Sequence, residues 1–322
     1  MAGFRGVVLV QQNGREVAAF AGGTTGASPG GACELGTRFQ IASVSKQFTA
    51  AAALLVAERG TLSVSDPVSR WLAGGPPGWD QVTVHHLLSH TSGLPHWRDL
   101  PGLDLTAPAS AEDLLGRLRS AGLLFVPGQR YSYSSPGYVL LAHIIEHAAG
   151  LPYARLLAEE IFGPLAMRST FAGNPAGQPG LASGHHAGAP VASWDLNTAN
   201  KGTGDIWSTA PDLAAWDQAL ARGQLLGAES RRAMLTAHAP VTEDYGLAIR
   251  PHGYGYGWFL GTGPGDRRVI YHPGDNAGFL AFNAWFPDHD TRLIMLTNDE
   301  TTDAAAAISH AVSLAFPVPP SP

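Results

Sequence analysis

The chain is organised around one stretch, Phe39-Gln40-Ile41-Ala42-Ser43-Val44-Ser45-Lys46-Gln47-Phe48-Thr49. An alanine-rich run follows it, with no glycine or proline before Gly60. Because alanine and leucine are the strongest helix formers and glycine often ends a helix, this run predicts a helix that stops near Gly60. Its first turn should hold Ser43 and Lys46. Residues three apart lie on one helix face, so the hydroxyl and the amine are expected to point the same way.

A serine and a lysine in this arrangement suit nucleophilic catalysis. A serine hydroxyl needs a neighbouring group to take its proton, and a lysine can do so only when its surroundings lower its pKa from about 10.4. A bare S-x-x-K pattern also fits a helix cap followed by a solvated lysine. The flanking residues are nearly all apolar, however, which predicts an interior helix. An interior lysine needs a specific role, so we interpret Ser43 as a candidate nucleophile with Lys46 beside it.

Length and composition describe a globular protein of one large or two ordinary domains. The chain has 322 residues, of which 45% are apolar and 14% charged, and its net charge is -6. There is no basic block, which argues against nucleic acid as a partner. The single cysteine, Cys33, excludes an internal disulfide and a cysteine-based metal site.

No targeting or membrane segment is predicted. No apolar run reaches the length of a membrane span, and Met1 leads almost directly into a predicted strand rather than a signal peptide. We therefore expect a cytoplasmic location for the sequence as written, and a leader removed beforehand stays open. The oligomeric state is also left open.

Predicted strands lie at both ends of the chain and predicted helices in the middle. Besides a hairpin over 6–20 with an Asn13-Gly14 turn, strands are predicted at 254–260, 268–271, 279–286 and 292–296. Helices after the first are predicted near 83–90, 110–121, 138–147, 153–161, 209–221 and 303–315.

The economical arrangement joins the terminal strands into one antiparallel sheet. We expect an α+β fold, with an antiparallel sheet of five or more strands flanked by helices plus an all-helical lobe. The expected sheet domain comprises residues 1–66 with 206–322, and the helical domain comprises 67–205. A site is expected in the cleft between the two domains.

Two further anchors follow Ser43-Val44-Ser45-Lys46 along the chain. They are Tyr133-Ser134-Ser135, in a turn before a helix, and His272-Pro273-Gly274, before a strand. Their order and spacing resemble the serine hydrolase family of class C β-lactamases, D-alanyl-D-alanine carboxypeptidases and their esterase and D-aminopeptidase relatives. The connecting stretches resemble the family too, so the resemblance spans nearly the whole chain. It implies a β-lactamase/transpeptidase-like fold and an acyl-enzyme mechanism.

The resemblance implies a role for each matched residue. Ser43 is the implied acylated nucleophile, Lys46 shares or relays its proton, and Tyr133 is the implied general base and later general acid. His272 occupies the first position of the third motif, at the edge of the cleft. A tyrosine is a poor base unless cations stabilise its phenolate, and we expect Lys46 and a protonated His272 to do so.

The implied oxyanion hole consists of the backbone N–H groups of Ser43 and Asp275, the residue just past Gly274. Two motif positions depart from the family pattern. Ser135 replaces the asparagine of Tyr-x-Asn, which weakens the contact to a substrate amide carbonyl. Pro273 replaces the hydroxyl residue of Lys-Thr-Gly, and the lysine of that motif is also absent.

These departures remove groups that would bind the carboxylate of a β-lactam or a peptide. We therefore expect a serine hydrolase that acts on a small-molecule ester, amide or short peptide and needs no cofactor. A D-stereospecific peptidase, a D-Ala-D-Ala carboxypeptidase and a weak β-lactamase remain alternatives. A catalytically silent binding or sensor module is a further alternative.

Two histidine motifs have competing interpretations. His143-Ile144-Ile145-Glu146-His147 matches an inverted zinc-peptidase pattern. No third ligand is identifiable, and this helix is structural in the resembled family, so we expect no metal site. His90 precedes Thr91-Ser92-Gly93, and we expect it to hydrogen-bond that turn.

Overall fold

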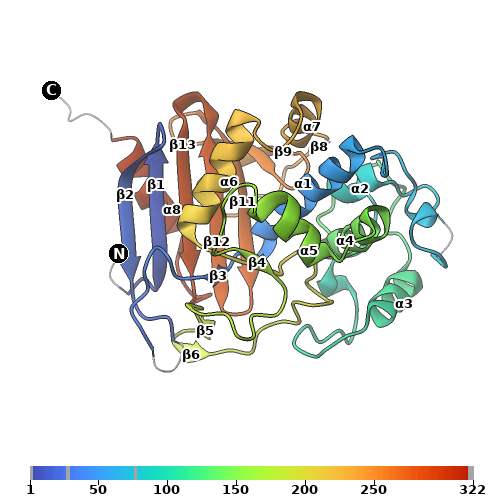
Figure 1. Ribbon diagram of the computed structural model, residues 1–322, viewed down its shortest axis with the longest axis horizontal. Coiled ribbons are helices and arrows are strands. Elements are labelled where there is room, and N and C mark those ends of the chain that lie inside the picture. The colour runs from blue at the N-terminus through green and yellow to red at the C-terminus, as the bar shows by residue number, and fades with distance from the viewer. Residues whose placement is uncertain (1–2, 27–29, 76–77, 318–322) are drawn as a thin grey trace.

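The computed structural model describes residues 3–26, 30–75 and 78–317. Within these residues, eight strands form one antiparallel sheet in the order β2-β1-β13-β12-β11-β10-β9-β8 (Figure 1). The strands are β1 (Gly6–Gln12), β2 (Arg15–Gly22), β8 (Ala239–Pro240), β9 (Arg250–Tyr254), β10 (Phe259–Gly263), β11 (Arg267–Asn276), β12 (Phe279–Phe286) and β13 (Thr291–Thr297). The first and last strands along the chain, β1 and β13, pair with each other, as expected from the sequence.

The predicted N-terminal hairpin is confirmed. Strands β1 and β2 pair across the turn at Asn13 and Gly14, whose φ angles are 52° and 74°. Positive φ at both central residues is the requirement of a type I′ turn, whose twist matches that of the flanking strands.

Helices cover both faces of the sheet. The α-helices of the described residues are α1 (Ser45–Glu58), α2 (Val84–Leu88), α3 (Ala111–Ala121), α4 (Ser135–Ala149), α5 (Tyr153–Leu157), α6 (Ala210–Arg222), α7 (Ala228–Met234) and α8 (Ala304–Ala315). Along β13, Ile294 and Leu296 join the core with α1 and α6, whereas Leu293 and Met295 join the core with α8. This alternation follows from the two-residue period of a strand.

The helix-rich middle of the chain lies at the end of the sheet farthest from β1 and β2 (Figure 1). Helices α2 and α4 pack on each other, and α4 also packs on α1. The expected α+β class is thus confirmed. The division into residues 1–66 with 206–322 and residues 67–205 stays a prediction. In the part of the chain that the structure describes, no helix is both long and apolar enough to cross a bilayer.

Helix boundaries follow the local signals closely. Thr83, Ser110 and Thr209 cap α2, α3 and α6 with their side chains, and α1 ends at Glu58, two residues before Gly60 with its φ of 76°. Helix α4 begins three residues earlier than expected. Its N-cap is Ser134, whose hydroxyl accepts a hydrogen bond from the backbone N–H of Gly137. The sequence does not predict the short helix α7, because seven residues are too few to show a clear helical period of apolar residues.

The strand predicted over residues 254–260 is wrong. Strand β9 ends at Tyr254 and β10 begins at Phe259, and a turn separates them. Gly257 lies in this turn with φ at 75°, and a Cβ atom there would stand 2.6 Å from the backbone oxygen of Lys46. The run therefore bends because it packs against the first turn of α1, a contact that no local pattern predicts.

Candidate active site

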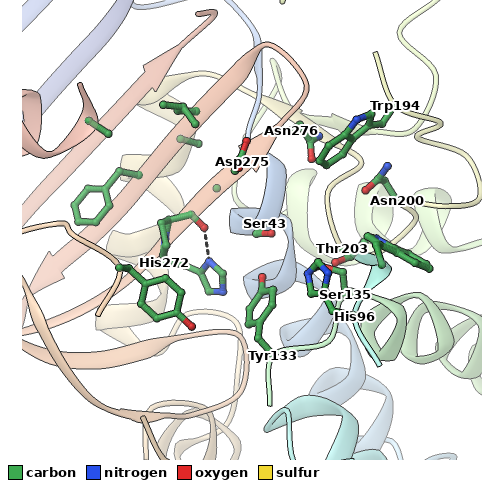
Figure 2. Close-up of a pocket in the computed structure, with 18 of the residues that line it drawn as sticks. Ser43, His96, Tyr133, Ser135, Trp194, Asn200, Thr203, His272, Asp275 and Asn276 are labelled. Carbon is green, nitrogen blue, oxygen red and sulfur yellow. Dashed lines mark hydrogen bonds between the residues drawn. The ribbon is translucent and has the colours of Figure 1, made fainter. Parts of the chain in front are cut away.

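Ser43 does not lie in the first turn of the helix, as expected, but in a 3-10 turn, Ala42–Val44, that leads directly into α1 (Ser45–Glu58). The preceding residue, Ala42, has φ at 46°, in the left-handed region that costs a non-glycine residue roughly 1–3 kcal/mol. Short strands hold the turn in place, because β3 (Phe39–Gln40) pairs with β7 (Ile206–Ser208) and the N–H of Ile41 donates to the oxygen of Ile206 at 3.0 Å. The serine is thereby presented at the rim of a cavity (Figure 2).

Lys46 is fully buried beneath Ser43. Its Nζ lies 2.9 Å from Ser43 Oγ, 3.0 Å from the oxygen of Thr203 and 3.4 Å from Ser135 Oγ. Burial lowers the pKa of Lys46 well below its usual value, and the carboxyl of Asp205 opposes this shift. A neutral amine can make these contacts with its two N–H groups toward Thr203 and Ser135 and its lone pair toward the Ser43 hydroxyl.

Tyr133 faces the same hydroxyl (Figure 2). Figure 2 shows its phenol oxygen directed at Ser43, and its ring centroid lies 4.9 Å from Lys46 Nζ. Burial raises the pKa of Tyr133, and the hydroxyls of Ser43 and Ser135 offset this only in part. The phenol therefore keeps its proton. Burial thus disfavours the phenolate expected from the sequence, and it also disfavours the charged form of Lys46.

His272 is buried and neutral. Burial is the main cause that lowers the pKa of His272 to about 3. Its Nδ1 lies 2.6 Å from the oxygen of Pro273, to which it must donate, because a carbonyl only accepts. Its Nε2 then accepts from the Tyr254 hydroxyl at 3.0 Å. Both ring nitrogens are engaged inside the protein, and the lowered pKa disfavours the protonated His272 expected from the sequence.

Gly274 and Asp275 bring β11 to the nucleophile. Their motif lies inside β11 rather than before a strand, since β10 pairs with residues 267–271 and β11 continues to Asn276. A Cβ atom on Gly274 would stand 2.5 Å from the oxygen of Ile41. Asp275 lies beside Ser43 at the cavity (Figure 2), as the predicted oxyanion hole requires. That hole stays a prediction.

Sequence reasoning missed two residues of the site. His96 places Nε2 3.5 Å from Ser135 Oγ, and its ring stacks on Tyr133 with centroids 5.8 Å apart. Thr203 contributes a backbone oxygen to Lys46. No local signal points to Thr203, because any residue type offers a carbonyl, whereas His96 directly follows the Gly93-Leu94-Pro95 segment of a matched stretch.

The residues of the zinc-like motif are occupied by other contacts. Glu146 accepts from the backbone N–H of Tyr153 at 2.7 Å and pairs with Lys201, and His147 Nδ1 lies 3.0 Å from the oxygen of Trp71. In the described residues, no group of three or more metal-ligating side chains is arranged around one point.

The cavity around Ser43 has a volume of about 640 Å³, and its lining has a polar side and an apolar side. Its polar side holds His96, Trp194 and Asn200, which Figure 2 shows on one side of Ser43. Its apolar side lies between the sheet and α8, and its lining residues are Pro273, Leu280, Phe282, Met295, Ala304 and Ile308. We call this side the apolar arm. Its floor is a row across three strands, because Phe282 is opposite both Pro273 and Met295.

The sequence matches the family model described as Beta-lactamase over residues 1–315. The chain belongs to the beta-lactamase family. This membership covers every element around Ser43, from β1 to the end of α8. The family expected from the three motifs is therefore confirmed.

Relatives of this beta-lactamase-family protein carry different names. Penicillin-binding protein 4* of Bacillus subtilis (strain 168) is 34% identical over 294 residues, which cover 85% of this chain and 63% of that protein. Esterase EstB of Burkholderia gladioli is 37% identical over 154 residues, which cover 41% of this chain and 38% of EstB. The chain thus spans less than two thirds of the length of either relative.

A solved structure shares the fold. D-amino acid amidase from Ochrobactrum anthropi SV3, complexed with D-phenylalanine, is 25% identical and superposes with a TM-score of 0.82. The superposition covers 97% of this chain and 93% of the amidase chain. The large antiparallel sheet with helices on both faces is therefore the fold of this amidase as well.

Proposed function

We propose that this beta-lactamase-family protein is a serine hydrolase that forms an acyl-enzyme on Ser43 and hydrolyses ester or amide bonds. The observation that carries the proposal is the 2.9 Å contact between Ser43 Oγ and the Nζ of the fully buried Lys46. Burial lowers the pKa of the amine and so favours its neutral, basic form, which an exposed lysine does not adopt near neutral pH. The names of the relatives, an esterase and an amidase among them, support this reaction class.

In the proposed acylation, the neutral Lys46 amine takes the Ser43 proton while Oγ attacks the substrate carbonyl carbon. The backbone N–H groups of Ser43 and Asp275 would hold the oxyanion of the tetrahedral intermediate. Collapse breaks the bond to the leaving group, which takes the phenol proton of Tyr133. The Lys46 ammonium then returns its proton to the phenolate. In deacylation, water takes the place of Ser43 as the nucleophile and gives its proton to Lys46. Ser43 Oγ is then the leaving group and takes the proton of Tyr133, which releases the acid and restores the enzyme.

Tyr133 acts in this scheme as the acid for the leaving group. Its raised pKa supports that role, because a phenol that keeps its proton can give it to an alkoxide or an amide nitrogen. The pair of neutral Lys46 and neutral Tyr133 replaces the phenolate base expected from the sequence. Burial favours the neutral pair because it disfavours both the ammonium and the phenolate.

The proposed substrate is a small ester or amide that carries no carboxylate beside the scissile bond. His272 supports this, because its two ring nitrogens bond to Pro273 and Tyr254 and leave no N–H for an anion. The carboxylate of Asp275 at the cavity would repel an anion further. The apolar arm supports a substrate with an alkyl or aryl group.

A D-stereospecific peptidase is the second candidate. The similarity to a D-amino acid amidase favours it. Turnover of D-Ala-containing peptides would be its readout, and a panel of short acyl esters, a chromogenic cephalosporin and D-Ala-D-Ala peptides separates the candidates.

The test is covalent labelling. A fluorophosphonate should modify Ser43, with the adduct located by mass spectrometry, and Ser43→Ala should lose both labelling and p-nitrophenyl acetate hydrolysis, the latter roughly a thousandfold. Ser45→Ala is the matched control, because Ser45 accepts a hydrogen bond from the N–H of Ile206 instead of facing the cavity. Wild-type rates in Ser43→Ala would show the proposal to be wrong.

A further inference from the structure

His90 stands at an unusual point of the backbone, directly after α2. Its φ is 55°, in the left-handed region that few residues other than glycine adopt, although histidine and asparagine tolerate it better than most. Its side chain is almost completely buried, at 1% exposure. The sequence predicts that His90 bonds the turn that follows it, but the structure directs both its carbonyl and its ring elsewhere.

His90 bonds to the residues on both sides of Tyr133. The N–H of Ser132 donates to the backbone oxygen of His90 at 2.8 Å. The N–H of Ser134 donates to His90 Nδ1 at 3.1 Å. One residue therefore fixes the backbone immediately before and immediately after the tyrosine.

The imidazole also packs on the tyrosine ring itself. The centroids of His90 and Tyr133 lie 4.2 Å apart with the planes inclined at 38°. Tyr138 and Tyr254 lie against the same imidazole, with centroids at 5.0 and 4.8 Å. With Tyr131 at a centroid distance of 6.0 Å, four tyrosine rings pack around His90 and leave its imidazole little freedom to turn.

The hydrogen bonds fix the state of the imidazole. Because Nδ1 accepts from Ser134, the proton of the neutral ring must sit on Nε2, which is buried and has no hydrogen-bond partner among the described residues. Burial lowers the pKa of His90 well below its usual value, so the ring stays neutral. If Nδ1 were protonated, its N–H group would face the backbone N–H group of Ser134, and the hydrogen bond between the two residues would be lost.

We propose that His90 is the positioning residue of Tyr133. The two flanking hydrogen bonds to the backbone and the ring stack hold the phenol oxygen in place next to Ser43. The inference rests on the proposed function, in which Tyr133 delivers a proton to the leaving group. Proton transfer requires a heavy-atom distance of about 2.6–3.2 Å, so a small displacement of the tyrosine slows it.

Two variants separate positioning from simple filling of the core. His90→Asn keeps an acceptor near Nδ1 and tolerates the positive φ but removes most of the ring, whereas His90→Phe keeps the ring and loses the acceptor. If His90 positions Tyr133, the Asn variant retains more activity than the Phe variant, even where thermal unfolding shows it to be the less stable. If His90 only fills space, the Phe variant is the more active, and the proposal fails. His90→Ala replaces the Phe variant if the latter does not fold, because alanine also lacks the acceptor.

The leaving group gives a second readout. Loss of the acceptor should lower kcat/KM roughly 10- to 100-fold for an alkyl acetate, whose alkoxide needs a proton, and much less for p-nitrophenyl acetate, whose leaving group does not. An equal loss on both substrates would contradict the proposal.

A double-mutant cycle with Tyr133→Phe completes the test. If His90 acts through Tyr133, His90→Phe has little further effect once the phenol is absent. Additive effects would overturn the inference while leaving the acyl-enzyme mechanism intact. Failure of the proposed function appears in a different measurement, the labelling and turnover of Ser43→Ala.

Discussion

The backbone oxygen of Ile41 lies 2.5 Å from the point where a Cβ atom on Gly274 would stand. This contact joins β11 to the turn that carries Ser43. The strand reaches the nucleophile so closely because position 274 has no side chain.

Gly274→Ala should therefore damage both stability and catalysis. The added methyl group meets the backbone oxygen of Ile41 and the Cβ atoms of Ala42 and Ala281, none of which can rotate away. We therefore expect a loss of about 1–3 kcal/mol in the free energy of unfolding and a large fall in kcat/KM as β11 moves from Ser43. Denaturant unfolding and ester hydrolysis measure the two effects. Gly116→Ala in α3 is the control, because nothing lies within 4 Å of its added Cβ and helical alanine is favourable. Full activity in Gly274→Ala would contradict the close approach of β11.

The pH dependence of acylation should follow Lys46. Because burial lowers the pKa of Lys46, the amine loses its proton well below pH 10.5, and kcat/KM should rise with pH through that lowered value and then level off. Lys46→Arg should be inactive at every pH, since a guanidinium stays protonated. If kcat/KM rises only near the ordinary lysine pKa, neutral Lys46 is not the base.

Asp217 should make the folded state less stable as pH rises. It is buried, its Oδ1 accepts from Asn283 at 2.8 Å, and burial raises its pKa from 3.8 to about 7. Between these values Asp217 holds a proton in the folded chain that it has lost in the unfolded chain, so its contribution to the free energy of unfolding falls from about pH 4 to pH 7. Asp217→Asn keeps the acceptor and removes this fall, which amounts to at most about 2–4 kcal/mol.

The comparison is made on melting temperatures at pH 4, 5.5, 7 and 8. The advantage of Asp217→Asn should grow up to pH 7 and stay constant above it. Asp80→Asn, at an exposed carboxyl, serves as the reference. A constant difference between wild type and Asp217→Asn across the range would rule out the shifted titration.

Blocking the apolar arm should change specificity without removing activity. Ala304 lies at the first turn of α8 and lines the arm, so Ala304→Trp should lower kcat/KM for octanoyl or octyl esters by roughly tenfold, the scale of a few lost methylene contacts. Acetate esters with small leaving groups should be hydrolysed almost as before. Ala306→Trp, at an exposed position of the same helix, is the matched control. Equal losses on short and long esters would show that substrates do not enter the arm.

Much of the fold could be predicted because its signals are local. The Asn13-Gly14 turn, the Thr83, Ser110 and Thr209 caps and the Gly60 stop each depend on a few neighbouring residues, and each holds in the structure. The strand predicted over 254–260 fails for the opposite reason. Gly257 bends the chain there to meet the backbone of Lys46, more than two hundred residues earlier.

The sequence by itself determined that Ser43 and Lys46 share a face, because their spacing of three fixes that geometry. It also indicated Tyr133 and the segment from His272 to Asp275 as their companions. Only the tertiary structure decided the protonation of these groups. Burial by distant segments lowers the pKa of Lys46 and of His272 and raises the pKa of Tyr133. A pKa depends on desolvation, and desolvation exists only once the chain has folded around the group.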